Sequence, residues 1–310
     1  MNIRLLRLVG EELRLLRAEG VEAIPVSEDT LARLKRAGGE GGDPEAVAAA
    51  PTERGDAAKG EAARAAPTRP EAPSRTGEAS APAKGPEFPP PPEIDLGEGG
   101  KPEKWERLRE RVLACPVCLE NRNPGKRIVF GVGSLDAEIF FCGEAPGADE
   151  EAEGEPFVGR AGELLNGMIR AMGLRREDVY IGNIMNWRPR TGSSYGNRPP
   201  TDEEMAFCLP YLKAQIAVVR PKVIVALGGT ATKGLLGVET RGQMGKLRGR
   251  WHEFEETPLM VTYHPSYLLH QESLASKRKV WEDLLRVMER LEMPISERQR
   301  NFFLAALKRE

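Results

Sequence analysis

The sequence has few histidines and few cysteines. Only three histidines and four cysteines occur among its 310 residues, so few side chains could act as acids and bases near neutral pH or as soft metal ligands. No apolar run approaches the ~18–20 residues that span a bilayer. The start, MNIRLLRLVGEELRLL, is too charged for a signal peptide. These absences predict a cytoplasmic protein without membrane contact, whose cysteines are reduced.

A strong net charge is also absent. The formal net charge is −2, and it is unevenly distributed. Residues 1–100 contain 13 Lys and Arg against 18 Asp and Glu, whereas residues 101–310 contain 32 against 29. We therefore expect any nucleic-acid-binding surface to be a local patch on the weakly basic second part.

Composition divides the chain into four segments. Residues 1–37 carry leucines at helical spacing and predict a short N-terminal helical segment, which either packs on the body or binds a protein partner. Residues 38–100 are rich in Pro, Ala and Gly and predict a disordered linker, because they offer too little apolar surface to offset the entropy of ordering. Residues 101–293 are expected to form the main domain and residues 294–310 a C-terminal helical tail. We expect a monomer.

Apolar runs alternate with helical patterns in the main domain. The runs lie at 128–133, 137–143, 179–184, 222–228 and 258–263, and the expected helices lie at 160–173, 202–219, 229–236 and 275–291. Apolar strands separated by helices are typical of a parallel sheet covered on both faces. The predicted fold class is α/β, with three layers (α/β/α) around a central, largely parallel four- to five-stranded sheet.

Four loops follow the predicted strands, and ligands of such sheets bind at the carboxyl ends of the strands. The Gly- and Pro-bounded turn Gly143–Glu150 brings backbone N–H groups close to a ligand. Phe157, flanked by Pro and glycines, could stack on a planar ligand. Asn183 offers a donor and an acceptor to a base edge, and His264 ends an apolar strand just before a proline. Each feature alone is as typical of an ordinary turn or core residue. Their convergence on one sheet edge favours a site.

A basic loop follows the third strand. It contains Arg188, Arg190 and Arg198 together with Trp187 and Tyr195. Arginines interleaved with aromatic residues suit a nucleic-acid backbone. A solvated basic loop explains the same residues equally well.

Together these loops resemble the family 4 uracil-DNA glycosylases. The matching motifs are Gly-Glu-Ala-Pro-Gly at 143–147, Pro-Phe-Val-Gly at 156–159, Gly-Asn-Arg at 196–198, Arg-Pro-Lys-Val-Ile-Val-Ala-Leu-Gly at 220–228 and His-Pro-Ser-Tyr-Leu-Leu at 264–269. The resemblance covers about residues 115–290. It implies a uracil-DNA glycosylase-like fold and a base-excision repair hydrolase that releases uracil from uracil-containing DNA and leaves an abasic site.

The resemblance also implies roles in the uracil pocket. Gly143, Glu144 and Ala145 line it, and Phe157 stacks on the flipped base, while Asn183 reads the polar edge of that base. The implied catalytic residues are Glu144, Glu150 and His264: Glu150 orients the attacking water, and His264 stabilises negative charge on the departing uracil. The chemistry agrees, because fixed donors aimed at developing charge lower the barrier.

Five further residues are implied to contact DNA: Arg188, Arg198, Ser266, Tyr267 and Leu268. The Tyr267–Leu269 segment would fill the gap that the extruded base leaves in the duplex. His270 stands where the family often has Arg, which weakens an expected phosphate contact.

The cysteines depart from the family pattern. The family usually holds a [4Fe–4S] cluster with four cysteines, and Cys115, Cys118 and Cys208 match three of these positions. Trp187 occupies the fourth, and Cys142 lies on a strand. Three thiolates are fewer than such a cluster normally needs. The sequence leaves open whether the cluster is lost, is completed by Cys142 or a non-cysteine ligand, or is replaced by another metal.

Two other functions remain open at this point. One is a glycosylase for another deaminated base, hypoxanthine or xanthine. The other is a non-enzymatic module that binds uracil-containing or single-stranded DNA. The joint presence of Glu144, Phe157, Asn183 and His264 favours an enzyme, because a binding module does not need the full set.

Overall fold

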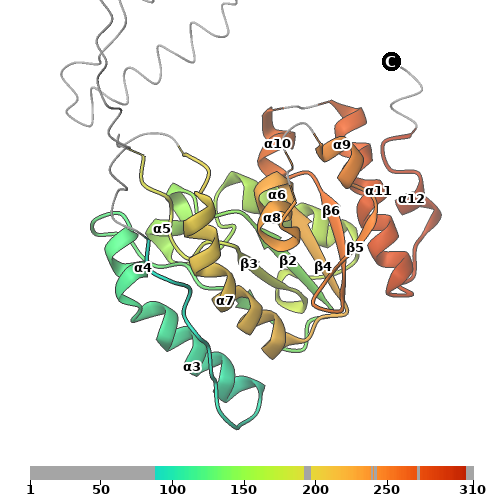
Figure 1. Cartoon of the computed structure of the whole chain (residues 1–310). Helices are drawn as coiled ribbons and strands as arrows, with labels where there is room; N and C mark the ends of the chain where they lie inside the picture. Colours follow the sequence, from blue (N-terminus) through green and yellow to red (C-terminus); the bar gives the residue numbers. More distant parts are fainter. Residues whose placement is uncertain (1–87, 192–196, 239, 241–242, 271–272, 305–310) are drawn as a thin grey trace, which may run out of the picture. The chain divides into compact units, whose positions relative to one another are not determined.

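A six-stranded sheet lies at the centre of the part of the chain that this computed structural model describes, residues 88–191, 197–238, 240, 243–270 and 273–304. The strand order is β1-β3-β2-β4-β6-β5 (Figure 1). The bounds are β1 Val132–Gly133, β2 Ile139–Gly143, β3 Tyr180–Asn183, β4 Val223–Leu227, β5 Trp251–Phe254 and β6 Thr257–Thr262. The expected segment 1–37, the linker up to residue 87, Tyr195, the side chain of His270 and residues 305–310 lie outside the described residues.

The inner strands confirm the predicted parallel sheet, and the edges differ from it. Strands β3, β2, β4 and β6 pair in parallel, whereas β1 and β5 pair antiparallel at the two edges. Of the strand expected at 128–133, only the last two residues form a strand, which is β1. Strand β5 was not expected, because its Trp-His-Glu-Phe sequence is not a continuous apolar run. It forms a hairpin with β6 through a turn at Glu255 and Glu256, both with positive φ.

Helices cover both faces of the sheet (Figure 1). The longer ones are α3 Lys101–Leu113, α6 Arg160–Ala171, α7 Asp202–Val219, α8 Gly228–Leu236 and α11 Leu274–Arg290, and the shorter ones are α4 Pro116–Asn121, α5 Ala148–Glu153, η1 Arg176–Asp178, α9 Met244–Leu247, α10 Pro265–His270 and α12 Glu297–Arg300. Among the described residues, no helix combines the length and apolarity that a bilayer crossing requires.

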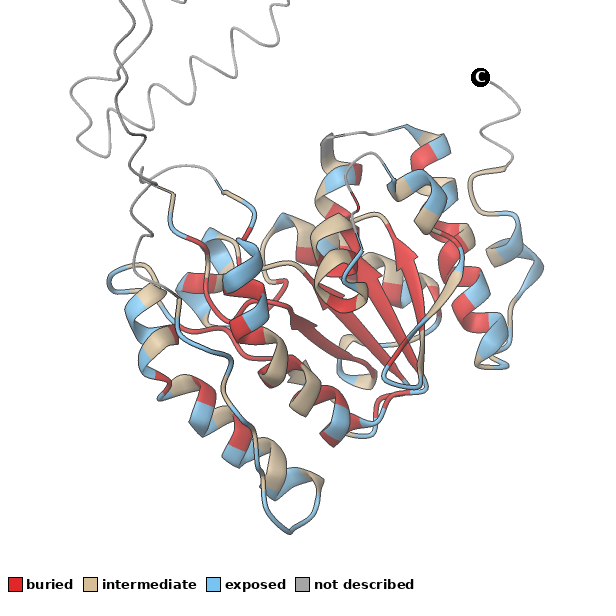
Figure 2. Ribbon diagram, in the orientation of Figure 1, coloured by how far each residue is buried: buried red, intermediate tan, exposed pale blue. Residues whose placement is uncertain are grey.

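Side chains alternate between two cores along each inner strand, as the period of a strand requires. On β2, Phe140 and Cys142 face a core built with α3, α4, α7 and α8, while Ile139 and Phe141 face a core built with α6, α10 and α11. Figure 2 shows the inner strands buried along their length. Fully burying one such apolar side chain contributes about 1.5–3 kcal/mol. The three layers therefore hold the strand ends rigidly.

Local signals explain where the helices start. Thr201 caps α7: its side chain accepts a hydrogen bond from the Glu204 backbone N–H at 3.2 Å, and the Glu204 carboxylate accepts from the Thr201 N–H at 2.8 Å. Ser273 caps α11 by accepting from the Ser276 N–H at 3.1 Å. Such caps satisfy N–H groups that have no partner within the helix.

The residues just before α3 correct the predicted linker boundary. Residues 88–98, here called the strap, are extended, and Phe88, Ile94 and Leu96 pack against the core. Composition concealed this, because three apolar residues are scattered through a Pro-rich segment. The folded domain therefore extends back to Phe88, and the disordered-linker prediction is wrong for residues 88–100.

The predicted C-terminal tail packs on the domain as far as it is described. The Trp281 indole N–H on α11 donates to the Gln299 carbonyl at 2.5 Å, and the Gln299 amide donates to the Ala171 carbonyl at 2.8 Å. The rings of Trp281 and Phe302 lie 5.1 Å apart. This part of the tail therefore belongs to the same core as α6 and α11.

Candidate active site

The carboxyl ends of the parallel strands align at one edge of the sheet. Gly143 pairs in register with Asn183, and Leu227 pairs with Thr262. The residues that follow these ends line a cavity of about 500 Å³, including Glu144, Phe157, Asn183, Gly228 and His264. The structure therefore brings together, around one cavity, the pocket residues singled out from sequence.

Gly143 allows three of these groups to meet. A Cβ at this position would lie 2.3 Å from the Asn183 side-chain Oδ1 and 2.6 Å from the Phe157 ring. Both distances are impossible for real carbon atoms. Glycine is thus required here because the Asn183 amide and the Phe157 ring both press against the backbone.

Phe157 is held in an unusual backbone conformation. Its φ is +54°, it is buried, and its carbonyl accepts from the Arg176 guanidinium at 3.2 Å. The same guanidinium donates to the Pro156 carbonyl at 2.6 Å and to the Asn166 side chain at 2.9 Å. Left-handed backbone in a bulky residue costs about 1–3 kcal/mol and persists only when its surroundings enforce it. Arg176, which the sequence did not single out, provides that support.

Asn183 lines the cavity and carries a buried polar atom without a partner among the described residues. Its side chain is 7% exposed, and its Oδ1 has no hydrogen-bond partner among the described residues. A buried acceptor left without a partner costs about 1–3 kcal/mol. The loop beyond it is fixed by backbone bonds from Ile184 to Gly143 and from Met185 to Glu144, both at 3.0 Å. The amide is therefore held at the cavity wall, with an unsatisfied acceptor that lies against Gly143.

His264 is held in a defined tautomer. The backbone N–H of Ser266 donates to its Nδ1 at 3.2 Å, and the Ser266 Oγ lies 2.7 Å from the same atom. A nitrogen that accepts from a backbone N–H carries no proton, so in the neutral ring Nε2 holds it. Burial lowers the pKa of His264 to about 4. At neutral pH the residue is therefore an uncharged Nε2–H donor. Its ring centroid lies 5.6 Å from that of Phe157.

Gly228 lines the cavity beside His264, and Thr230 contacts Glu144. Gly228 has φ +89°, and a Cβ there would lie 2.8 Å from the His264 Cβ, so only glycine fits between β4 and His264. The Thr230 hydroxyl hydrogen-bonds the Glu144 carboxyl. Burial raises the pKa of Glu144 above its usual value, and the Thr230 bond partly opposes this rise. Glu144 is thus a partly desolvated carboxyl with one side-chain partner.

Glu150 also borders the cavity, and its carboxylate is occupied by backbone groups. One oxygen accepts from the Gly147 N–H at 3.0 Å, and the other accepts from the N–H groups of Val158 and Gly159, both at 3.1 Å. These bonds join the turn after β2 to the Phe157 loop. Glu150 therefore holds the Phe157 loop against the turn after β2 through backbone hydrogen bonds.

The arginines predicted to contact DNA are paired within the protein. Arg188 donates to the buried Glu151 carboxylate at 2.8 Å. Arg198 makes a two-pronged contact with Glu204 at 2.6 and 2.7 Å. Both line the cavity mouth, but their charges are already compensated. The ion pairs could not be foreseen, because the partners come from other helices.

Arg160 is an exposed cation at the same mouth that the sequence reading missed. It begins α6 and lines the cavity, and within the described ranges it has no hydrogen-bonding or ionic partner. Its position directly after the Phe157 motif was the signal in the sequence that could have identified Arg160.

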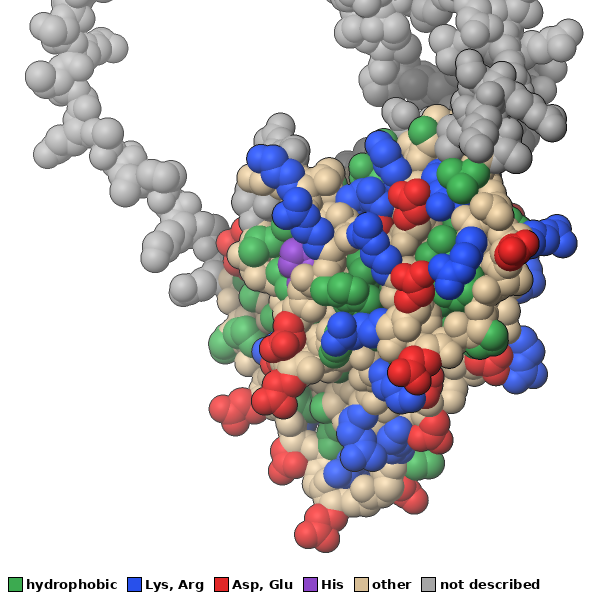
Figure 3. All heavy atoms as spheres, turned by 90° about the vertical axis from the view of Figure 1, so that its right-hand side faces the viewer, with side chains coloured by type: hydrophobic (Ala, Val, Ile, Leu, Met, Phe, Trp, Pro, Cys, Tyr) green, Lys and Arg blue, Asp and Glu red, His purple; other side chains and the backbone are tan. Residues whose placement is uncertain are grey.

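Figure 3 shows basic and acidic side chains interspersed on the face that carries α11 and α12.

The turn after His264 presents Tyr267 and hides Leu268. Tyr267 is 37% exposed and stacks on Tyr263 at 4.6 Å, whereas Leu268 is 3% exposed and packs in the core. The Arg248 guanidinium lies 5.5 Å from the Tyr263 ring centroid and pairs with the buried Asp283 carboxylate. The structure thus gives the exposed position to Tyr267, and the DNA contact predicted for Leu268 does not match its buried side chain.

The cysteines lie in the opposite core from Phe157, and all four are buried and free. The Cys118 thiol donates to Cys115 and lowers the pKa of Cys115 to about 5. Burial raises the pKa of Cys208 and of Cys142. Within the described part of the chain, no three His, Cys, Asp or Glu side chains are grouped so that they could hold a metal ion. The donor set therefore does not fit a four-thiolate [4Fe–4S] cluster.

The fold and the cavity define a class of base-excising enzymes, and sequence comparison identifies it. The profile of the Uracil DNA glycosylase superfamily matches residues 130–285, so the chain belongs to this superfamily. Several of its relatives are named type-4 uracil-DNA glycosylases. The chain is 43% identical over 183 residues to the type-4 uracil-DNA glycosylase of Thermotoga maritima. The aligned segment covers 59% of this chain and 92% of that protein.

Two archaeal proteins give the same result. The type-4 uracil-DNA glycosylase of Archaeoglobus fulgidus is 38% identical over 179 residues, covering 56% of this chain and 86% of its own. That of Sulfurisphaera tokodaii is 35% identical over 219 residues, covering 67% and 93%. The recognised resemblance and the α/β fold class are therefore confirmed.

Proposed function

We propose that this chain hydrolyses the N-glycosidic bond between uracil and deoxyribose in DNA, releasing free uracil and leaving an abasic site. The observation that carries the proposal is the cavity in which Phe157, Asn183 and His264 converge. Relatives that match most of their length to this chain are named uracil-DNA glycosylases. The reaction belongs to base-excision repair.

The cavity suits a single extruded pyrimidine. Uracil within a duplex is inaccessible, so it must be flipped out at a cost of a few kcal/mol. The Phe157 ring offers a stacking face, and the unpaired Asn183 Oδ1 can accept from the uracil N3–H. The substrate would thereby satisfy the polar atom that the protein leaves without a partner.

His264 stabilises the leaving group in this proposal. Bond cleavage leaves negative charge on uracil, and a neutral imidazole with its proton on Nε2 can donate to the uracil O2 as that charge develops. Because the pKa of His264 is lowered to about 4, the ring stays neutral at physiological pH. The Ser266 backbone N–H fixes the ring, so the donor needs no reorganisation during the reaction.

Glu144 is the carboxylate that positions water and balances the sugar cation. Glu150 was expected to orient water, but its oxygens accept three backbone N–H bonds. Glu144 lines the cavity, and among the described residues its one side-chain partner is the Thr230 hydroxyl. An ionised carboxylate beside the sugar stabilises the cationic transition state. We therefore assign Glu150 to the loop and Glu144 to the chemistry.

Arg160, Ser266 and Tyr267 form the proposed DNA contact around the cavity mouth. Arg160, which has no partner among the described residues, offers its guanidinium to a phosphate. Tyr267 offers an exposed ring to the space left by the extruded base. Arg188 and Arg198 support the neighbouring loop through their ion pairs.

The test uses the full chain and labelled oligonucleotides that contain one uracil, hypoxanthine, xanthine or thymine at the same position. Alkali cleaves the strand wherever a base has been released, and the thymine strand is the matched control. We expect cleavage at uracil and none at thymine. Faster release of hypoxanthine or xanthine would assign a different base. Tight binding without release of any base would identify a binding module and overturn the proposal.

A further inference from the structure

Trp187 occupies the position where the family normally has its remaining cluster cysteine. It follows β3 by four residues, is 1% exposed, and lies in the same core as Cys115, Cys118 and Cys208. An indole N–H is only a donor, so Trp187 cannot replace a thiolate as an iron ligand. This core therefore has an indole where a four-cysteine site has its fourth thiolate.

Aromatic rings surround Trp187. Phe88 from the strap lies 6.5 Å from the Trp187 ring at an interplanar angle of 19°, and Phe207 on α7 lies 6.3 Å from it. Phe88 and Phe207 themselves pack edge to face at 5.7 Å. Aromatic pairs of this kind contribute beyond their buried area. Phe88, Trp187 and Phe207 are here called the aromatic plug.

The nearby thiols are engaged in hydrogen bonds with protein groups. Cys115 accepts from the Cys118 thiol and from the Tyr211 hydroxyl, and Cys208 accepts from the Asn186 backbone N–H. Tyr211 lies one helical turn from Phe207, and their rings are 6.2 Å apart. The thiols and the plug therefore form one continuous packed layer between α4 and α7.

We propose that this chain replaces the [4Fe–4S] cluster of its family with the aromatic plug, and that Phe88 of the strap completes the replacement. In relatives a cluster would cross-link the α3–α4 region to α7 and to the loop after β3. Here the Trp187 side chain fills part of that space from the loop after β3. Phe88 of the strap packs against the Trp187 ring from the N-terminal side. The three remaining cysteines stay in this layer as buried side chains that are hydrogen-bonded to protein groups.

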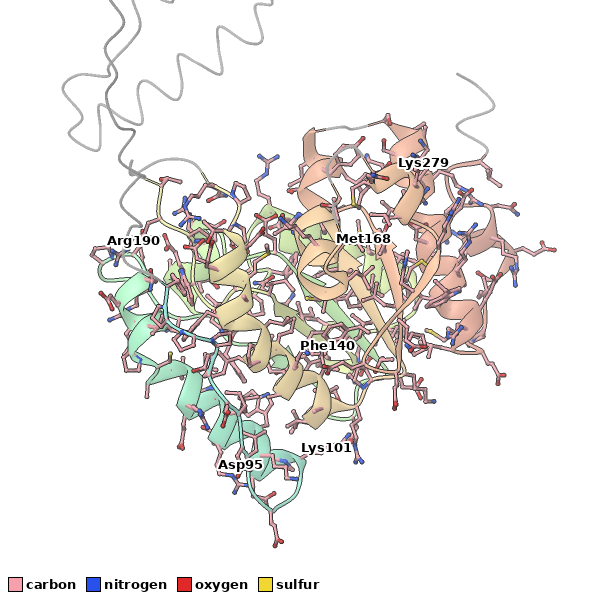
Figure 4. All side chains as sticks on the ribbon, in the orientation of Figure 1. Asp95, Lys101, Phe140, Met168, Arg190 and Lys279 are labelled. Atoms are coloured by element: carbon pink, nitrogen blue, oxygen red, sulfur yellow. The ribbon has the colours of Figure 1, made fainter. Side chains whose placement is uncertain are left out.

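The strap is fastened so that Phe88 stays in place. It runs alongside α3 in the opposite direction, and its residue Asp95 lies near the start of α3 (Figure 4). Arg190, from the loop after β3, lies beside α4 in the same view. Arg111 on α3 donates to the Glu93 carbonyl, and Arg107 donates to the Glu98 carbonyl at 2.6 Å. The chain then reverses at Gly97 and Gly99, both with positive φ.

Burial alternates along the strap as it would in a β-strand. Phe88, Pro92, Ile94 and Leu96 are half-buried, while the residues between them are exposed. This alternation directs one row of side chains into the core. The strap is therefore a specific packing element that ends in the plug.

The plug also connects to the proposed uracil site. Trp187 lies between Asn186, whose carbonyl accepts from the Val129 N–H at 2.8 Å, and Arg188, which pairs with Glu151. The same loop begins at Asn183. Packing around Trp187 therefore fixes the loop that presents the base-reading amide.

The first experiment measures iron. The full chain is incubated anaerobically with ferrous iron and sulfide, desalted, and assayed for iron, acid-labile sulfide and visible absorption. We expect no stoichiometric iron or sulfide. About four irons and four sulfides per chain, with the absorption of a cluster, would overturn the proposal.

The second experiment restores the family pattern. The double variant Phe88→Ala, Trp187→Cys supplies a fourth thiol and removes the plug. If its thermal unfolding stays cooperative, we expect it to take up iron and sulfide in the same assay. A folded double variant that takes up neither would show that these two side chains are not what excludes the cluster, contrary to the proposal.

The third experiment measures the contribution of Phe88 to stability. Phe88→Ala should lower Tm by about 5 °C or more, because the plug loses one of its rings. Pro90→Ala is the matched control, since Pro90 is exposed in the same strap. Equal Tm values for the two variants would contradict a structural role for Phe88.

Discussion

The uracil cavity and the aromatic plug treat buried polar atoms differently. Both contain one without a partner among the described residues: Asn183 Oδ1 in the cavity and Trp187 Nε1 in the plug. Asn183 lines a cavity of about 500 Å³ into which a base can enter. The Trp187 ring packs against Phe88 and Phe207. An unpaired buried atom therefore points to a ligand only where its side chain borders a cavity.

The largest expected effect tests the role of His264 in the cavity. His264→Ala removes the Nε2–H donor and should slow single-turnover uracil release by about 10²–10³-fold, because preorganised donors act on the developing charge. His252→Ala is the control, since the His252 Nε2 contacts the Leu247 carbonyl beside β5. Rates measured by alkaline cleavage should separate the two variants. Equal rates would remove His264 from the mechanism.

A smaller effect separates two carboxylates at the same cavity. Glu144→Gln keeps the size of the side chain and removes its charge, so release should slow by about 10²-fold with little change in Tm. Glu150→Gln loses acceptors for backbone N–H groups, so its main effect should be a Tm lower by several degrees. Rate and Tm measured on both variants test the assignment. A reversed pattern would return the water-orienting role to Glu150.

Truncation sharpens the plug side of the comparison. Deleting residues 1–87 should leave release of uracil and the free energy of unfolding unchanged. Deleting residues 1–98 also removes the buried side of the strap and should cost about 3 kcal/mol. Denaturant unfolding of the two shortened chains measures the difference. If both deletions behave alike, the strap contributes nothing to the fold.

The smallest effect concerns pH. His264 is half-buried by exposure and its ring is desolvated, so its folded pKa of about 4 lies below the ordinary value of 6.5. The unfolded chain therefore binds this proton first, and stability decreases as pH falls from about 6.5 to about 4. His264→Gln should remove that part of the pH dependence. Unfolding of both proteins at several pH values gives the difference curve. A flat difference would mean that His264 titrates normally.

The sequence sufficed for the parts that depend on short-range pattern. The apolar runs ending at Gly143, Asn183 and Leu227 predicted parallel strands, and parallel strands end at one edge. Phe157 and His264 could therefore be placed near one another without coordinates. Their roles stay predictions until the variants are measured.

Side-chain pairing was not readable in the same way. The ion pairs of Arg188 with Glu151 and Arg198 with Glu204 depend on how helices and loops meet, and sequence spacing does not show this. The burial of Leu268 beside the exposed Tyr267 depends on the direction of α10. The strap was missed because its apolar residues follow a period of two within a Pro-rich composition.

The central claim is that the cavity keeps His264 neutral with its proton on Nε2. Nitrogen NMR of the full chain labelled with ¹⁵N-histidine reports the protonation of both ring nitrogens directly, and His264→Gln assigns the signal. The account predicts a neutral Nε2–H ring at pH 6 that titrates near pH 4. An imidazolium at pH 6, or a neutral ring protonated on Nδ1, would contradict it.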